Sequence, residues 1–497
     1  MDKKKSLLNV STSIFSRILL LVAAFFIRRL LIRYIGNDIN GLNSLYTSII
    51  GLLAVAELGV GRAISYSMYK PIVEDDEKKI AALYSLYQRL YRAIGTVIFL
   101  AGIIVLPFLP RLISDYESLD VNVYLTFFLL LVSVVLTYLY GAKTSLIMAH
   151  KDDYITTGIL TVGHLIGYGL QALSILLFRS FAFFIGCHIV ETCVIWGMTD
   201  IVVRKRHREI VNRREEVDGE TRLEISRNVK AMCMHRIGSA LVNSIDNVII
   251  SAFIGVMILG KYSNYILISS VISGIISLFF SPLTAVVGHL CSGGDTAEIK
   301  KTYDRFYILN YALGVVFFLG YYAVIDDVIL MCFGPGLEMS RAISFIISLN
   351  GFVSFFRTAT LLFRNASGTF YYDRWKPILE VVMNLILSLI FVNVFPDEYK
   401  VIGVIVSTIV IILMISDVVE PYVLYRHVFG APVKYFWIKN YANIALFVAG
   451  LTILTLLNQK NAGLFLNGFI AIGVSLAVLG VAFGLNRIAT RIIREKS

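Results

Sequence analysis

The sequence of 497 residues is 57% hydrophobic and only 16% charged, with a formal net charge of +11. Soluble domains are about 45–50% apolar and about 25% charged, so this composition excludes a soluble enzyme, a disordered chain and a disulfide scaffold. The hydrophobic residues form long uncharged stretches, such as Leu100–Leu109, Val121–Leu139 and Val401–Met414. Stretches of membrane-spanning length that recur along a chain predict a polytopic α-helical membrane protein.

The net positive charge has two interpretations. It could reflect a nucleic-acid partner, or the enrichment of Lys and Arg in the cytoplasmic loops of membrane proteins. The basic residues are concentrated between the apolar stretches, and the loop Arg204–Lys230 alone contains nine of them. We therefore attribute the charge to membrane topology and expect no nucleic-acid partner.

The chain begins with Lys3-Lys4-Lys5 and an apolar stretch that continues to about Arg33. This stretch is too long for the core of a signal peptide and lacks a small-residue cleavage site, so we interpret it as the first spanning helix. Thirteen further apolar segments follow, at about 42–68, 81–109, 122–149, 155–178, 181–203, 229–253, 260–290, 305–330, 341–367, 377–395, 401–425, 441–457 and 463–484.

Fourteen spans place both ends of the chain on the same side of the membrane. The loops on that side hold most of the Lys and Arg residues between the spans, which predicts that both termini are cytoplasmic. The connections between spans are too short to form an independent domain. Any chemistry or transport is therefore expected to take place among the helices.

An internal repeat becomes visible when the sequence is shifted by 219 residues. Two chance-similar bundles would also give some matches, but matches in a single register favour a true repeat. The repeat predicts two six-helix lobes, 1–220 and 221–430, related in parallel around a central cavity, and a remainder, 431–497, with helices 13 and 14 and a cytoplasmic tail. The matched pairs are Asn9 and Asn228, Arg17 and Arg236, Gly36 and Gly255, Gly41 and Gly260, Tyr46 and Tyr265, Tyr84 and Tyr303, and Gly95 and Gly314.

Arginines within the predicted helices are the candidate substrate-binding residues. An Arg at the centre of a spanning helix costs about 2.5–3.5 kcal/mol on insertion scales, and such residues usually face a water-filled cavity or a charged partner. A cavity lined by arginines would bind an anion such as a phosphate or carboxylate. Arginines near helix ends can instead extend their side chains to the membrane surface. The candidates are Arg17, Arg28, Arg62, Arg236, Arg357 and Arg364.

Acidic residues within the helices have two interpretations. Each could pair with a nearby arginine, or it could bind H⁺ or Na⁺ and couple transport to an ion gradient. Glu57, Asp246 and Glu191 are the candidates, and Glu380, Asp417 and Glu420 are further acidic residues of these helices.

Histidines and cysteines give no metal signal. His164 and Gln171 form a polar stripe seven residues apart, and His188 and Glu191 are an i, i+3 pair. Neither arrangement has the spacing of a metal site, and the five cysteines lie at unrelated spacings. We expect no metal, no disulfide framework and no cofactor apart from a coupling ion, H⁺ or Na⁺.

Three motifs near the start carry a family resemblance: Tyr34-Ile35-Gly36, the run Ala56–Tyr66 with its Glu-Leu-Gly-Val-Gly-Arg core, and Lys70-Pro71-Ile72. They resemble the start of the bacterial polysaccharide flippases, the O-antigen, capsule and exopolysaccharide exporters of the multidrug/oligosaccharidyl-lipid/polysaccharide (MOP) superfamily. The resemblance implies two six-helix lobes around a cavity in the bacterial cytoplasmic membrane. It also implies that an undecaprenyl-pyrophosphate-linked oligosaccharide is flipped by alternating access.

By the same resemblance, Arg17 and Arg236 would hold the pyrophosphate, with Arg62 and Arg357 as further contacts. Helices 13 and 14 are additional to the common twelve, as in the related lipid II flippases, where such helices form a groove for the lipid tail. The implied partners are the lipid-linked glycan, the bilayer, and a polysaccharide polymerase and glycosyltransferases of the same pathway.

Two alternatives remain at this point. A multidrug antiporter of the same superfamily would need an acidic cavity for cationic drugs, whereas the polar stripes here are basic. A membrane-embedded polysaccharide polymerase would be an enzyme and would usually carry a sizeable extramembrane loop, which we do not find. We therefore predict a flippase rather than an enzyme.

Overall fold

The computed structural model describes residues 3–57, 60–213, 215–217, 219, 244–280, 283–293, 295–457 and 463–496. These residues form helices and short connections, with no β-strand among them. Eleven of the helices are long and apolar enough to cross a membrane. The predicted all-α polytopic membrane fold is thereby confirmed.

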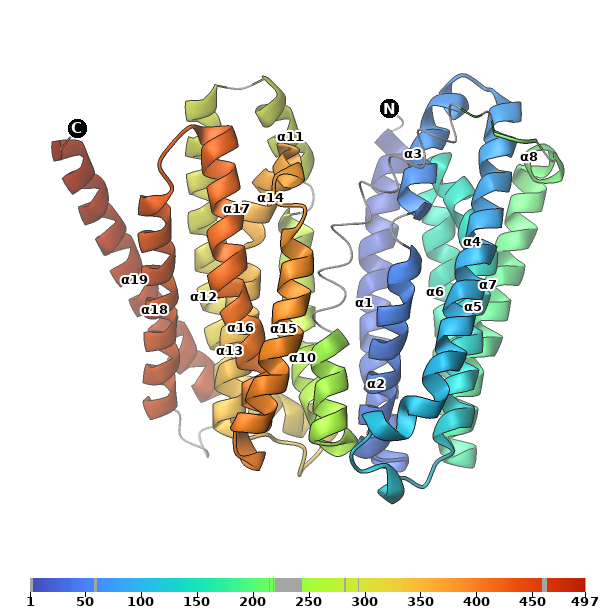
Figure 1. Ribbon diagram of the computed structural model, residues 1–497, viewed down its shortest axis with the longest axis horizontal. Helices are drawn as coiled ribbons and strands as arrows, with labels where there is room; N and C mark the ends of the chain where they lie inside the picture. The colour runs from blue at the N-terminus through green and yellow to red at the C-terminus, as the bar shows by residue number, and fades with distance from the viewer. Residues whose placement is uncertain are drawn as a thin grey trace. The chain divides into compact units, whose positions relative to one another are not determined.

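The chain divides into two compact units, Met1–Gly260 and Lys261–Ser497, which we call unit 1 and unit 2. In unit 1, α1 packs on α6, and α5 packs on both α4 and α7. Its helices, labelled in Figure 1, are α1 (Lys3–Tyr34), α2 (Asn37–Leu53), η1 (Ala54–Glu57), α3 (Val60–Val73), α4 (Glu77–Val105), η2 (Leu106–Leu112), η3 (Tyr116–Ser118), α5 (Val123–Ala149), α6 (Asp153–Phe178), α7 (Phe181–Arg206), α8 (Arg208–Asn212) and Ser244–Phe253.

The helices of unit 2 begin with α10 (Val256–Phe280), whose first five residues still belong to unit 1. The others are α11 (Leu283–Gly293), α12 (Thr296–Phe333), α13 (Arg341–Phe356), α14 (Thr358–Ala366), η4 (Thr369–Tyr371), α15 (Lys376–Val394), η5 (Asp397–Tyr399), α16 (Lys400–Ile411), η6 (Ile412–Ser416), α17 (Asp417–Leu424), η7 (Tyr425–Phe429), α18 (Lys434–Leu457) and α19 (Gly463–Lys496).

Two predicted spans are interrupted. The segment 42–68 is divided by the tight turn η1 into α2 and α3, and the segment 260–290 is divided into α10 and α11. Hydropathy alone could not locate these breaks, because apolar residues are frequent on both sides of each break. Glycine lowers helix propensity, and Gly59 and Gly61 follow the break in unit 1.

Several pairs that are 219 residues apart have equivalent local structure. α2 begins at Asn37 and α10 at Val256, each directly after a glycine with a positive φ, 143° at Gly36 and 117° at Gly255. Asp76 and Asp295 are also 219 apart, and their side chains accept backbone N–H bonds at the starts of α4 and α12, at 3.0 and 3.3 Å. A side-chain oxygen satisfies an N–H that has no partner within the helix.

The start of α10 lies against α2 with almost no space between the backbones. A Cβ atom at Gly41 would be 1.8 Å from the Val256 carbonyl oxygen, and one at Gly260 would be 2.2 Å from the Asn37 carbonyl oxygen. Asn37 Nδ2 donates to the Met257 carbonyl at 2.9 Å. Glycine is required where two backbones approach this closely.

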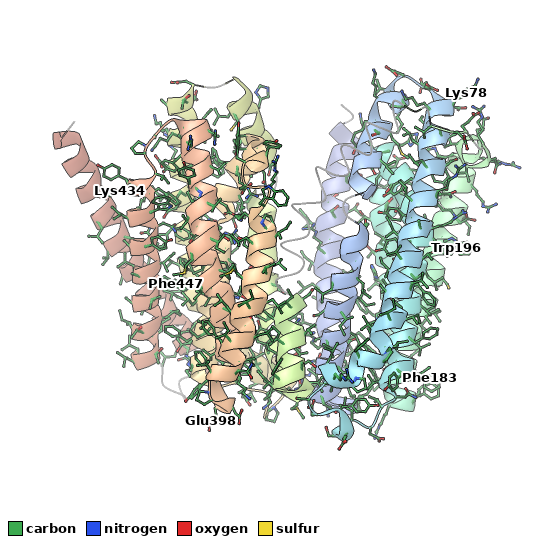
Figure 2. All side chains as sticks on the ribbon, viewed as in Figure 1. Lys78, Phe183, Trp196, Glu398, Lys434 and Phe447 are labelled. Carbon is green, nitrogen blue, oxygen red and sulfur yellow. The ribbon has the colours of Figure 1, made fainter. Side chains whose placement is uncertain are left out.

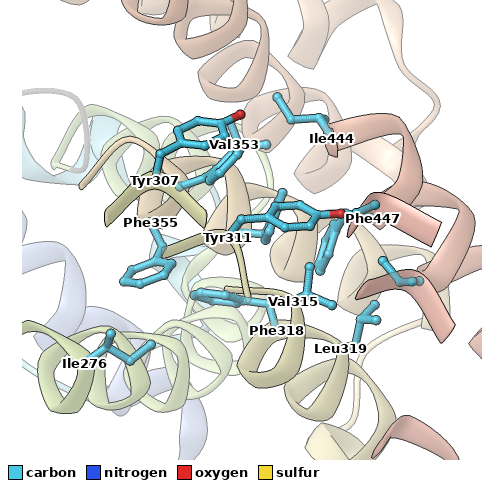
Figure 3. Packing of buried hydrophobic residues seen from close by; sticks show 14 of the residues in the cluster. Ile276, Tyr307, Tyr311, Val315, Phe318, Leu319, Val353, Phe355, Ile444 and Phe447 are labelled. Atoms are coloured by element: carbon cyan, nitrogen blue, oxygen red, sulfur yellow. The ribbon is translucent and has the colours of Figure 1, made fainter. Parts of the chain in front are cut away.

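Unit 2 has an aromatic core in which the last two helices take part. Tyr307 and Tyr311 lie one turn apart on α12, and Phe355 and Phe318 lie close to them (Figure 3). Phe447 of α18 stacks on Phe352 of α13 with ring centroids 3.8 Å apart. α19 packs along α12 and α18, so α18 and α19 are integral to this core.

The outer surfaces of both units suit a lipid environment. Exposed large apolar side chains lie along the helices, among them Leu177, Val394 and Leu456. Charged side chains lie at helix ends in Figure 2: Lys78 lies at one end of unit 1, and Glu398 and Lys434 lie at opposite ends of unit 2. Apolar flanks with charged ends indicate a multi-pass membrane protein.

Acidification is expected to destabilise unit 1 through His207, which follows α7. Its burial, together with the ring of His150 at 4.3 Å, lowers the pKa of His207 to about 4. An unfolded histidine has a pKa of about 6.5. Because the unfolded chain then binds more protons than the folded chain, stability should fall as the pH is lowered from about 6.5 to about 4.

Thermal unfolding of the purified protein at a series of pH values tests this expectation. The midpoint should fall less steeply in His207→Gln than in the wild type, whereas the exposed His427→Gln should follow the wild type. Equal pH dependence of wild type and His207→Gln would contradict it.

Candidate functional site

Unit 2 contains a buried cluster of charged residues built around Glu420. The helix that carries it, 400–429, is continuous but contains two wide π-helical turns, η6 and η7. Asp417 and Glu420 lie between these turns and are 6% and 1% exposed. Single π turns within α-helices are frequent at functional sites.

Arg357, at the junction of α13 and α14, binds Glu420 with two parallel bonds. Its Nη2 is 2.5 Å from Oε1 of Glu420, and its Nε is 3.2 Å from Oε2. This two-pronged geometry matches a planar guanidinium to a planar carboxylate and is among the stronger hydrogen-bonded arrangements in proteins. The Arg357 side chain is 16% exposed.

Two further cations approach the same carboxylate. Arg364 of α14 is 2.5 Å from Asp373 and 3.5 Å from Oε1 of Glu420. Lys376, the first residue of α15, binds Glu420 directly and lies 3.1 Å from Glu380. The charge cluster of unit 2 therefore contains three cations and three carboxylates: Arg357, Arg364, Lys376, Asp373, Glu380 and Glu420.

The balance of charge explains how the cluster can be buried. Moving an ion out of water costs several kcal/mol, which pairing repays only when the geometry is good and the remaining polar atoms are bonded. Each cation here has a carboxylate within 4 Å. Glu420 touches all three, so it is the residue on which the cluster depends.

A chain of polar side chains extends the cluster toward α18 and α12. Asn440 of α18 donates to Asp417 at 3.2 Å and accepts from the Tyr307 hydroxyl at 3.1 Å. Asn443, one turn further along α18, donates to Tyr307 at 3.2 Å. The charged helices α14, α15 and α17 are thus connected to α12 and α18 through buried hydrogen bonds.

The acidic candidates of unit 1 have different environments. Glu57 accepts a hydrogen bond from the Tyr91 hydroxyl at 2.6 Å. Glu191 of α7 lies 2.5 Å from His164 and 3.2 Å from His188. Asp246 lies in the helix Ser244–Phe253 and is 5% exposed.

The candidate arginines are distributed over both units. Arg17 is exposed on α1, and Arg28, on the same helix, is partly buried. Arg62 lies in α3, and Arg236 lies outside the described residues. Arg357 and Arg364 are brought together around Glu420. The expectation that intramembrane acids pair with arginines is confirmed for Glu420.

Lys376 and Asp373 were not among the residues predicted from the sequence. A local signal for Lys376 existed, because Lys376 and Glu380 are four residues apart on one helix face. The contact of Lys376 with Glu420, 44 residues away, had no such signal.

Comparison with known proteins identifies the fold. No protein-family model matches the sequence, and no curated protein matches it. Among solved structures, the lipid II flippase MurJ in an inward-closed conformation has a TM-score of 0.65 at 13% identity. The match covers 97% of this chain and 99% of that one.

Multidrug transporters have the same fold. An inward-facing multidrug resistance MATE family transporter of the MOP superfamily matches with a TM-score of 0.59 at 12% identity, over 80% of this chain and 92% of its own. A mutant of the Vibrio cholerae MATE transporter VcmN matches with a TM-score of 0.56 at 11% identity, over 86% of this chain and 100% of its own. The chain therefore has the fold shared by MurJ and these MOP transporters.

Proposed function

We propose that this protein is a flippase for a polyprenyl-pyrophosphate-linked oligosaccharide, which it moves across the bacterial cytoplasmic membrane by alternating access. The observation that carries the proposal is the extent of the fold match: MurJ, a flippase for the lipid-linked precursor lipid II, covers nearly the whole chain. In this proposal both termini are cytoplasmic, and the glycan serves the synthesis of a surface polysaccharide.

The length of the chain favours a flippase over a multidrug antiporter. The MATE transporters are almost completely covered by their matches but leave a part of this chain without a counterpart. In this chain α18 and α19 are integral to the core of unit 2. A protein with these two helices is closer in size to the flippase than to the antiporters.

The charges also favour an anionic cargo. Arg17 is exposed on α1 and forms no ion pair with any residue that the structure describes, so among these residues it has no carboxylate partner with which a pyrophosphate would have to compete. Arg357 and Arg364 already bind carboxylates, and a pyrophosphate would have to compete with Glu420 and Asp373 for them. We therefore assign first capture to Arg17 and its repeat mate Arg236, with Arg28, Arg62, Arg357 and Arg364 as secondary contacts.

Replacing Arg17 or Arg236 by alanine is expected to reduce export of the lipid-linked glycan by at least tenfold. Loss of a charged hydrogen-bond partner costs roughly 1.5–3 kcal/mol, and about 1.4 kcal/mol corresponds to a factor of ten. Export is measured in cells or inverted vesicles after correcting for protein abundance. Arg17→Lys should retain part of the activity, because lysine keeps the charge but lacks the planar guanidinium group that can bind a phosphate through two N–H donors.

Arg111→Ala is the matched control, because Arg111 is exposed at the end of a span, in η2. Unchanged export in both Arg17→Ala and Arg236→Ala would contradict the site assignment. Increased drug sensitivity of a deletion strain, with normal surface polysaccharide, would favour the antiporter instead.

A further inference from the structure

Unit 1 contains a cluster of ionisable side chains halfway along two packed helices. His164 and Gln171 lie on α6, and His188 and Glu191 lie on α7. Each pair is on one helix face, because residues three, four or seven apart project in similar directions. An ionisable group at this depth is rare in membrane proteins and usually has a function.

The carboxylate is at the centre of the cluster. Nδ1 of His164 is 2.5 Å from Oε1 of Glu191, and Nδ1 of His188 is 3.2 Å from Oε2. The Glu191 side chain is 9% exposed, whereas those of His164 and His188 are 37% and 30% exposed. The carboxylate is therefore shielded, and the two imidazoles lie between it and the surface of the unit.

Gly167 makes this arrangement possible. A Cβ atom at position 167 would be 2.3 Å from Oε2 of Glu191 and 2.6 Å from its carboxyl carbon. The carboxylate thus rests directly on the backbone of α6, one turn from His164. At Gly169, by contrast, a Cβ atom would meet nothing within 4 Å.

The hydrogen bonds define the tautomers of the two histidines. An ionised carboxylate only accepts, so Nδ1–H of each imidazole donates to Glu191. The Gln171 amide then donates to Nε2 of His188 at 3.0 Å, which completes the bonding of that ring. Nε2 of His164 makes no hydrogen bond to any residue that the structure describes, so its lone pair can accept a proton.

Other ionisable side chains near Glu191 come from α5, α6 and α7. Tyr140 of α5, Tyr168 of α6 and Cys187 of α7 interact electrostatically with Glu191. α1 packs on α6, and Asn9 of α1 accepts from the backbone N–H of Tyr154 at 2.9 Å. At about 1.5 Å of rise per residue, Arg17 of α1 is then close to the level of His164.

We propose that His164 and Glu191, with His188, form a proton-binding site, in which the proton enters on Nε2 of His164. Binding converts a neutral imidazole beside a carboxylate into an imidazolium–carboxylate pair. The added positive charge lies at the level of Arg17, where it would favour an anionic cargo. The role in transport rests on the proposed function, whereas proton binding does not.

Histidine nitrogen NMR on the full-length protein in nanodiscs tests proton binding directly. The His164 resonances are those missing from His164→Gln. As the pH is lowered over the range in which the protein stays folded, Nε2 of His164 should pass from unprotonated to protonated while Nδ1 stays protonated. A His164 ring that keeps one protonation state throughout this range would overturn the proposal.

The Nδ1–H tautomer provides a second readout that a merely structural role would not affect. Gly167→Ala should displace the carboxylate and give a mixture of the two tautomers, whereas Gly169→Ala should keep the wild-type tautomer. An unchanged tautomer in both Gly167→Ala and Glu191→Gln would show that Glu191 does not orient His164, and would overturn the site.

Coupling is tested separately, with inverted vesicles and a fluorescent polyprenyl-pyrophosphate glycan. In the wild type, the rate of translocation should depend on an imposed pH gradient. His164→Gln should lose this dependence. The control His289→Gln, at an exposed position on α11, should keep it. Gradient dependence that persists in His164→Gln would exclude this site as the coupling site. Absence of any translocation in the wild type would instead contradict the proposed function and leave the NMR result standing.

Discussion

Glu420→Ala is expected to destabilise unit 2 by about 3–5 kcal/mol, the range measured when one partner of a buried ion pair is removed. Lys376 would keep Glu380, and Arg364 would keep Asp373. Arg357 would lose the only carboxylate that lies within 4 Å of it among the described residues. An uncompensated guanidinium within the helices is the cause of the loss.

Thermal unfolding of the purified protein and its abundance in membranes measure the effect. Glu398→Ala, at the exposed start of the span Asp397–Phe429 that also contains Glu420, should leave both unchanged. The double variant Glu420→Ala with Arg357→Met should recover much of the loss, because apolar replacement of a whole buried pair is often neutral. A single variant as stable as the wild type would show that Glu420 does not organise the cluster.

Gly41→Ala is expected to destabilise unit 1 by about 1–3 kcal/mol or more, the usual cost of overpacking. The new Cβ would be 1.8 Å from the Val256 carbonyl oxygen, which is backbone and cannot rotate away. α2 and the start of α10 would have to separate, and the bond from Asn37 to Met257 would break.

Gly158→Ala is the matched control. Gly158 lies inside α6 with nothing within 4 Å of its Cβ position, so alanine should be neutral or stabilise by up to about 1 kcal/mol. The unfolding midpoint should therefore fall in Gly41→Ala and stay the same or rise in Gly158→Ala. A Gly41→Ala protein with a wild-type midpoint would mean that the two helix starts are free to separate.

The all-helical membrane-spanning architecture followed from composition, because long uncharged apolar runs have few alternatives in a helical membrane protein. The number of spans did not follow: the sequence predicts fourteen, whereas eleven helices of the described residues are long and apolar enough to cross a membrane. The helix break at Ala54–Glu57 did not follow, since a hydropathy profile averages over the turn that contains it. The equivalent starts of α2 and α10 were nevertheless implied by the 219-residue repeat, through Gly36 and Gly255.

The site was predictable only in part. The sequence indicated that arginines and acids within the spans would matter, and the pair His188 and Glu191 was visible as an i, i+3 spacing. Arg357 and Glu420 are 63 residues apart, and no local periodicity links them. The π turn at Ile412–Ser416 also changes the helical phase just before Asp417, so a regular helical wheel places Glu420 on the wrong face.

The turn η1 has a consequence for how unit 1 meets the lipid. In Figure 1, α2 occupies one half of the height of unit 1 and α3 the other, so η1 lies near mid-height. Hydrocarbon offers no hydrogen-bond partners, so irregular backbone at such a depth is tolerated only where protein covers it or water reaches it. The side of unit 1 that carries η1 is therefore not in contact with lipid acyl chains. Annular lipids must contact the unit along its other helices.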